Sequence, residues 1–111
     1  MNQVQQLEKQ LDDAKTLVET RQMAIRLFQN PDFKKLIMDG FCLHDAARYA
    51  QESGDPALDV EQRADALAMA QASGHLKRFL SMAVQMGAHA ERTMPELHAA
   101  LDEVRAEEGG E

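Results

Sequence analysis

The residues best suited to metal or nucleophile chemistry in this chain of 111 residues are four histidines and one cysteine. The histidines are His44, His75, His89 and His98, and their spacing fits no compact zinc motif. His89 and His98 are nine residues apart, so they do not share a helix face as ligands at positions i and i+4 would. The single thiol, Cys42, lies in an apolar run, which is typical of a buried structural cysteine. We therefore predict no metal site and no cofactor.

Catalysis by other residue types is not indicated either. Cys42 and His44 combine a nucleophile with a base, but two residues this close in sequence say nothing about the geometry that such a pair needs. The adjacent acids at 12–13 and 107–108 are typical of solvated helix faces, and the sequence contains no glycine-rich phosphate loop. The sequence therefore predicts a protein that is not an enzyme and has no catalytic residue.

The composition predicts one all-α domain. Hydrophobic residues make up 44% of the chain, mainly Ala, Leu, Met and Val, with no Trp, four Phe and one Tyr. These aliphatic residues, together with Glu, Gln, Lys and Arg, favour helices, and the β-branched or aromatic runs that mark strands are missing. A chain of this length has room for a single small core.

Charge and hydropathy narrow the classes of partner. The formal net charge is −7, and residues 91–111 carry seven acidic against two basic residues. Nucleic-acid binding requires a basic face, so we do not expect DNA or RNA as the ligand. The N-terminal residues are too polar for a signal peptide, and no apolar run approaches the ~20 residues that span a bilayer. We expect a cytoplasmic protein without a membrane partner.

An apolar heptad pattern runs through the N-terminal part of the chain. Eight positions at alternating steps of three and four carry seven apolar residues, and Arg21 is the exception. They are Val4, Leu7, Leu11, Ala14, Val18, Arg21, Ile25 and Phe28. This spacing is typical of a coiled coil, and Asn30-Pro31 is the first feature that ends a helix. The pattern predicts a helix over residues 3–29.

Two short helices are expected between residues 31 and 58. Asn30 is a good N-cap and Pro31 suits the first helical position, while Gly40 has the properties of a C-cap. These signals predict a first helix of about nine residues. A second short apolar face follows, and Gly54 ends it.

A long C-terminal helix is predicted over residues 59–105. Asp59 and Gln62 have the spacing of a capping box at its start. A second heptad series then follows at Leu76, Leu80, Ala83, Gly87, Ala90, Met94, Leu97, Leu101 and Val104. The acidic residues 106–111 are expected to form a frayed tail.

Two residues could interrupt this helix. Gly74 follows a serine and marks a weak point where the helix could bend. At Pro95, either a new helix starts at Met94 or one helix continues with a kink. The heptad phase is unbroken across Pro95, so we favour one continuous or mildly kinked helix.

The two heptad series can bury each other if their helices pair in antiparallel direction. One register places Arg21 opposite Gly87 and Val4 opposite Val104, so that large residues face small ones through the middle. The expected fold is therefore an all-α, long antiparallel coiled-coil-like helical hairpin with short helices capping one end. A slip of one heptad, and parallel self-association through both series, stay open.

Residues outside the two series predict a second interface. The interaction candidates are Arg21, Met23, Leu27, Phe33, Lys34, Lys35, Phe41, Tyr49, Met82 and Met86. A two-helix hairpin has one seam, so the Leu and Met residues outside it are exposed unless the central helices cover them. Methionine suits adaptable surfaces, although methionine at helical spacing is also typical of plain core. We expect a homo-oligomer or a complex with another protein.

The central motif NPDFKKLIMDGF resembles a pattern in small helical proteins of tailed bacteriophages. That pattern consists of Asn-Pro-Asp-Phe-Lys, Leu-Ile, Gly followed by Phe or Tyr, an acidic-Ala-x-Arg helix and a DPAL loop. The chain has these elements at residues 30–34, 36–37, 40–41, 45–48 and 55–58, and the resemblance extends over residues 20–100. Pro95 departs from the smooth C-terminal helix of that pattern. The resemblance brings no known activity; it implies a phage origin and a role in virion assembly.

The expected function is a non-catalytic assembly or virion-associated factor that acts through coiled-coil association, with residues 30–50 as a docking head. It would act in the host cytoplasm or on the virion. The alternative is a small phage-encoded effector whose acidic C-terminal end occupies a basic site of a host protein. A prefoldin-like holding chaperone shares the two-ended hairpin layout, but the helical connector argues against that class.

Overall fold

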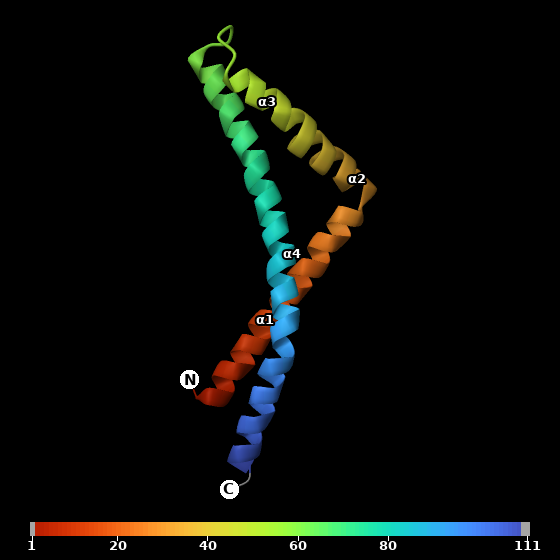
Figure 1. Cartoon of the computed structure of the whole chain (residues 1–111), viewed down its shortest axis with the longest axis vertical. Coiled ribbons are helices and arrows are strands. Elements are labelled where there is room, and N and C mark those ends of the chain that lie inside the picture. Colours follow the sequence, from red (N-terminus) through yellow and green to blue (C-terminus); the bar gives the residue numbers. More distant parts are fainter. Residues whose placement is uncertain (1, 110–111) are drawn as a thin grey trace. The chain divides into compact units, whose positions relative to one another are not determined.

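The computed structural model describes residues 2–109, which contain helices and no strand (Figure 1). The elements are α1 (Gln3–Gln29), α2 (Pro31–Phe33), η1 (Lys34–Asp45), α3 (Ala46–Ser53) and α4 (Val60–Gly109). The expected all-α class is confirmed, and α1 has the range that its heptad pattern predicts. No helix among the described residues has both the length and the apolar character needed to cross a membrane.

The helices form two compact units, which we describe separately. Unit 1 combines the part of α1 up to Ala24 with the part of α4 from Met82 onward, and unit 2 comprises Ile25–Ser81. The acidic excess lies almost entirely in unit 1. Its residues include eleven acids and five bases, a net charge of −6, whereas unit 2 has eight acids and seven bases, a net charge of −1.

A side-chain capping pair starts α1, and a change of backbone conformation ends it. The Asn2 Oδ1 accepts a hydrogen bond of 2.8 Å from the Gln5 backbone N–H, and the Asn2 N–H donates to Gln5 Oε1 at 3.1 Å. This reciprocal pair is a capping box. At the other end, Asn30 adopts an extended conformation with φ −74° and ψ 122°, which ends the α-helical path. The proline that follows favours this conformation.

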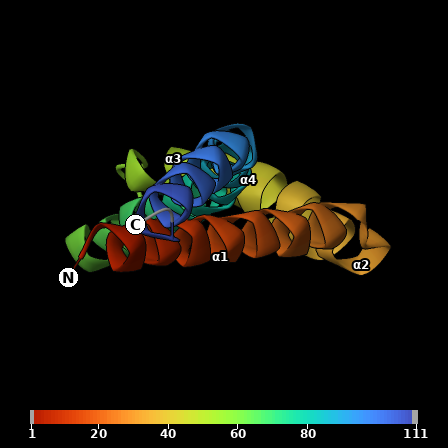
Figure 2. The same cartoon turned by 90° about the horizontal axis from the view of Figure 1, so that it is seen from below.

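Unit 1 is held by a row of mostly small residues between α1 and α4. The buried residues are Leu11, Ala14 and Ala24 in α1 and Gly87, Ala90, Leu101 and Val104 in α4. Glu8 pairs with Arg105 and Arg21 pairs with Glu91, so residue numbers rise along α1 as they fall along α4. The beginning of α1 and the end of α4 accordingly lie at the same end of the unit (Figures 1 and 2).

Unit 2 contains one uninterrupted helical segment from Pro31 to Ser53, so the expectation of two short helices separated at Gly40 is wrong. Gly40 does not have the positive φ of a left-handed C-cap, and the helical segment continues through it. Gly40 instead lies inside η1, a π-helical segment with wider turns. An added Cβ at Gly40 would lie 3.2 Å from the Lys35 carbonyl oxygen, five residues earlier.

The turn between α3 and α4 follows the predicted signals. Gly54 caps α3, and its N–H donates to the Gln51 carbonyl oxygen at 3.1 Å. At the start of α4, the Gln62 N–H donates to Asp59 Oδ1 at 2.7 Å and the Asp59 N–H donates to Gln62 Oε1 at 3.1 Å. This is the capping box that the sequence predicts before Val60.

α4 continues through both suspected interruptions and into the predicted tail. Gly74 and Pro95 lie inside one helix, so no new helix starts at Met94. The expectation of a frayed tail from residue 106 is wrong as far as Gly109, because the helix extends to that residue. The reason is the strong helix propensity of the Ala and Glu residues there. The rest of the predicted tail, residues 110–111, lies outside the described residues.

The core of unit 2 joins η1 to α4. Cys42 of η1 is buried, and its Sγ lies 4.0 Å from the carbonyl oxygen of Ser73. On α4 the buried residues Ala66, Ser73 and Leu80 follow one another at steps of seven. The second heptad series therefore begins further upstream than the predicted Leu76. The upstream start of the series is hard to recognise in the sequence, because Ser73 is a polar residue. Its hydroxyl can be buried because it donates a hydrogen bond to the Ala70 carbonyl oxygen at 2.8 Å.

We predict that Asn30→Ala will destabilise the protein by about 1 kcal/mol, a fall in Tm of roughly 4 °C. The Asn30 Oδ1 accepts hydrogen bonds from the N–H groups of Asp32 at 2.9 Å and Phe33 at 3.0 Å, and alanine removes both. Thermal unfolding followed by circular dichroism measures the change. The exposed neighbour provides the control, and Gln29→Ala should leave Tm within about 2 °C. Equal effects of the two variants would contradict the capping role.

Candidate interaction surfaces

The residues considered for metal or nucleophile chemistry do not come together. The histidines at 44, 75, 89 and 98 are all exposed. In the described part of the chain, no group of three or more His, Cys, Asp or Glu residues is arranged to hold a metal ion. Cys42 is free and only 7% exposed, which confirms the prediction of a buried structural thiol.

α1 and α4 approach each other closely at Gly87 in unit 1. An added Cβ there would overlap the Cβ of Arg21 and would lie 2.7 Å from the carbonyl oxygen of Leu17. Only a residue without a side chain permits this distance between the two backbones. The structure thus brings together Arg21 and Gly87, the pair that large-against-small matching of the two heptad series selects.

Arg21 covers Gly87 with its stem and sends its charged end to the surface. The side chain is 28% exposed, and its Nη1 lies 3.9 Å from Glu91 Oε1. Its Nε is buried and has no hydrogen-bond partner. This arrangement is the one expected of a long cationic side chain whose methylene groups pack while the guanidinium reaches water.

One flank of the α1–α4 contact in unit 1 is charged. Arg105 Nη2 donates to Glu8 Oε1 at 2.8 Å, and Glu91, on the same flank, pairs with Arg21. Glu8, Glu91, Arg105 and the exposed His98 all occupy heptad position e. Exposed ion pairs of this kind contribute about 0–1 kcal/mol each, so this flank is a solvated edge.

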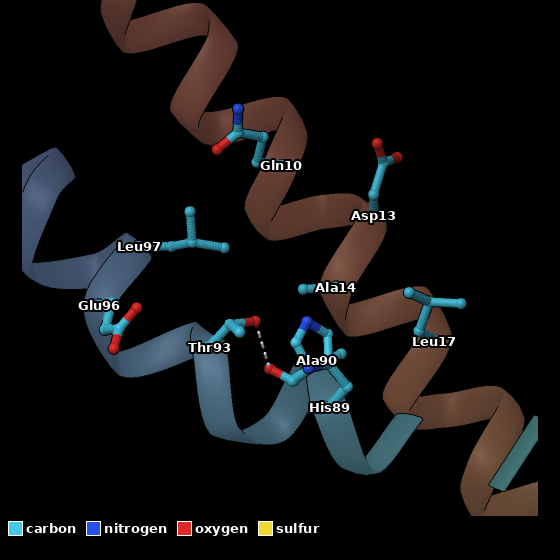
Figure 3. Close-up of a pocket in the computed structure, with 9 residues that line it drawn as sticks. All are labelled: Gln10, Asp13, Ala14, Leu17, His89, Ala90, Thr93, Glu96 and Leu97. Atoms are coloured by element: carbon cyan, nitrogen blue, oxygen red, sulfur yellow. Dashed lines mark hydrogen bonds between the residues drawn. The ribbon is translucent and has the colours of Figure 1, made fainter. Parts of the chain in front are cut away.

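The opposite flank is an open apolar groove (Figure 3). Its lining residues are Gln10, Asp13, Ala14 and Leu17 of α1 and His89, Ala90, Thr93, Glu96 and Leu97 of α4. Figure 3 shows Ala14 and Leu97 in the space between the helices, while the Thr93 hydroxyl donates to the Ala90 carbonyl oxygen at 3.2 Å. None of the ion pairs among the described residues joins α1 to α4 on this flank.

The methionines of unit 1 differ in their relation to this groove. Met86 is 45% exposed and lies one helical turn before Ala90, on the groove flank of α4. Met82 is 37% exposed and precedes Met86 by four residues on the same face. Met23 is 50% exposed, but its heptad position is on the face of α1 opposite the seam. Two of the three predicted methionines therefore flank the groove, and one does not.

In the predicted docking head, residues 30–50, the aromatic residues are partly used for packing. Phe33 is half-buried and its ring meets that of Phe28 edge to face, with centroids 6.2 Å apart. Phe41 and Tyr49 are also half-buried. These three candidates therefore have limited surface left for a partner.

Two other residues form the most exposed apolar surface of the predicted docking head. Leu36 and Leu43 are 71% and 58% exposed, and neither was among the predicted interaction residues. Leu36 borders a surface hollow together with Asp32, Lys35, Gly40 and Asp45. Both leucines lie in apolar stretches of the sequence, which are equally typical of a buried face, so only their exposure in the structure identifies them.

The remaining cationic and apolar candidates of unit 2 lie at its surface. Lys34 and Lys35 are exposed, and Leu27 is 43% exposed. The Arg48 guanidinium lies over the Tyr49 ring, 4.4 Å from its centroid. Hydrogen bonds to Tyr49 and then to Glu52 raise the pKa of Arg48, so this group keeps its positive charge.

Comparison of the chain with protein-family models, with curated proteins and with solved structures gives no match.

Proposed function

We propose that this protein is a non-catalytic interaction protein that joins other proteins through helix–helix packing. The observation that carries the proposal is the number of large apolar side chains left in solvent. The exposed ones include Met23, Leu27, Leu36, Leu43, Val60, Leu67, Phe79, Met82 and Met86. Surfaces that expose large apolar side chains in such number are typical of proteins that are covered by a partner.

The helix pairing that we infer for this function is an antiparallel coiled-coil-like hairpin of α1 and α4. It is supported by the Glu8–Arg105 ion pair and by the approach of Arg21 to Gly87. It is also supported by heptad burial, since none of the predicted seam positions among the described residues is exposed. A hairpin of two helices buries only the seam between them, so the outer faces of both helices stay accessible to partner proteins.

The partner that we propose is a structural protein of a tailed-phage particle, and the role is virion assembly. This part rests on the resemblance of residues 30–58 to small helical phage proteins. The docking surface would be the exposed face of the helical segment Pro31–Ser53, where Leu36 borders the hollow with Lys35 and Asp45. An apolar residue ringed by charges of both signs suits a partner helix of mixed polarity.

Purified particles test this proposal. We expect particles and proheads to contain the protein in many copies, detected by mass spectrometry or immunoblot. Leu36→Glu should reduce incorporation on the order of tenfold, because it places a charge in an apolar contact. Val60→Glu provides the control, since Val60 is 73% exposed and lies outside the docking surface. Absence of the wild-type protein from particles would refute the assembly role.

A second function is favoured by the charge of unit 1. With a net charge of −6, unit 1 presents the kind of surface that binds a basic site, including one that normally contacts nucleic acid. In this case the protein would be an effector that inhibits or redirects a host protein. It would be absent from particles, would be toxic when expressed alone in the host, and would bind its target more weakly as salt rises.

A further inference from the structure

The groove flank of α4 carries a stripe of six residues at alternating steps of four and three, all within unit 1. They are Met82, Met86, His89, Thr93, Glu96 and Ala100. This spacing puts them on one face of the helix. Thr93 and Ala100 are half-buried and the other four are exposed. The stripe is therefore free to contact another molecule.

The stripe is self-complementary about its middle. Met86 and Ala100 are each seven residues from Thr93, and His89 and Glu96 lie four and three residues from it on either side. When two copies of the stripe meet in antiparallel direction about Thr93, Met86 faces Ala100, and Glu96 lies one residue, about 1.5 Å along the axis, from the position opposite His89, which is within reach of the two side chains. Each contact then occurs twice, as two-fold symmetry requires. A long side chain meets a small one, and an imidazole N–H meets a carboxylate.

The two polar residues His89 and Glu96 of this stripe have no interaction partner within one copy of the described chain. No hydrogen bond or ion pair among the described residues engages His89 or Glu96. They cannot reach each other along α4, because seven residues of helix span about 10.5 Å. Charge complementarity therefore points to a second α4 as the occupant of the groove.

The apolar residues of the groove support the same occupant. Leu17 and Leu97 are only half-buried where α1 and α4 meet, and the buried residues beside them are Ala14 and Ala90. Alanines fill little space, so the two helices alone leave an open groove between the leucines. A helix laid along this groove would cover Leu17, Leu97 and Met86 in one contact.

We propose that α4 of a second copy of this chain occupies the groove of unit 1, antiparallel to the first α4, across a two-fold axis at Thr93. This inference rests on the proposed function, because it names one partner of the interaction protein. The negative charge of unit 1 opposes the contact only weakly. Asp13 and Glu96 are the only acids that line the groove, and charges further away are screened over about 8 Å at physiological salt.

Solution mass measured over a concentration series tests the contact. We expect the wild-type protein to reach twice its monomer mass of 12.4 kDa at high concentration. Met86→Glu should raise the dimer dissociation constant on the order of 100-fold, because it places two extra carboxylates in an apolar contact. The control is Met23→Glu, the same change at an exposed methionine away from the groove, and it should leave the dissociation constant within about twofold.

Each other outcome overturns the inference. A wild-type protein that stays monomeric at every concentration removes the dimer, but it leaves the proposed binding to a particle protein intact. A dimer that survives Met86→Glu, or that Met23→Glu weakens equally, uses another surface. Circular dichroism of both variants shows whether each has kept its helices.

A cysteine at the proposed axis tests the geometry separately. Thr93→Cys should form a disulfide between two copies under mild oxidation, because a residue on the axis faces its own symmetry mate. The native thiol does not interfere, since Cys42 is buried in unit 2. Met23→Cys, away from the axis, should stay reduced under the same conditions. Equal cross-linking of the two variants would overturn the two-fold arrangement.

Discussion

Replacing Gly87 with leucine should lower the melting temperature of the protein by roughly 10 °C, a loss of about 2–3 kcal/mol. The first atom of any side chain at this position would overlap the Arg21 Cβ, and it would lie 2.7 Å from the Leu17 carbonyl oxygen. The carbonyl is part of the backbone of α1 and cannot rotate away as a flexible side chain can. The helices of unit 1 must therefore separate, and the buried residues along their contact become hydrated.

Gly74 provides the matched control for this experiment. It lies in the same helix, but it is exposed, and an added Cβ would meet no atom within 4 Å. Gly74→Leu should therefore hold or raise Tm, because leucine has a helix propensity about 0.7–1 kcal/mol better than glycine. Thermal unfolding followed by circular dichroism measures both variants. Equal changes in Tm at the two positions would refute the close contact at Gly87.

Replacing Pro95 with alanine should stabilise the protein by about 2 kcal/mol and raise Tm by roughly 8 °C. Pro95 is exposed inside α4, where it lacks the N–H that would bond to the Glu91 carbonyl oxygen. Its ring also crowds the preceding turn, and the two effects together cost about 3 kcal/mol in a helix interior. The greater freedom of alanine in the unfolded chain takes back up to about 1 kcal/mol.

Pro31 tests whether the gain depends on position within a helix. Pro31 is the first residue of α2, directly after the Asn30 cap, where a missing N–H has no consequence and the fixed φ is suitable. Pro31→Ala should leave the free energy of unfolding unchanged or lower it by up to about 1 kcal/mol, a fall in Tm of at most roughly 4 °C. If Pro95→Ala instead lowered Tm, the ring of Pro95 would be making a packing contact that outweighs its cost to the helix.

Local signals in the sequence predict the ends of the helices well, because each depends on a few neighbouring residues. The Asn30 cap, the Asp59–Gln62 capping box and the Gly54 cap all have the predicted hydrogen bonds. The approach of Arg21 to Gly87 follows from matching two heptad series, since a large residue can face a small one in few registers. These features need no knowledge of the remaining contacts.

Two residues of unit 2 depart from the structural role that their residue type has most often. Glycine is common at helix ends, but Gly40 has no positive φ and lies inside η1. Ser73 precedes Gly74 at the point where the sequence allows a bend, but α4 continues there, and the Ser73 hydroxyl is satisfied within its own helix while the residue is buried. Ser73 also contacts Cys42 of η1, a residue far from it in the sequence, and such a contact cannot be predicted from local preferences.

For the surface residues, too, the sequence predicts some features, and others depend on how the helices pack. The methionines at 82 and 86 lie on the outer face that the heptad positions predict, and both are exposed. Which flank of the seam is apolar could not be derived from one helix. It depends on the side from which α1 meets α4, and the structure puts Glu8 and Arg105 on one side and Leu17 on the other.

The amino-acid sequence alone predicts the all-α class and the positions of α1 and of the start of α4, because helix propensity and caps are properties of short segments. It also determined that Gly87 is the position where a large residue from α1 can fit. The folded structure alone reveals that the segment Pro31–Ser53 is uninterrupted and that one flank of unit 1 is an open groove. These features depend on contacts between residues far apart in the chain, whose free energies exceed the local preferences that a sequence displays.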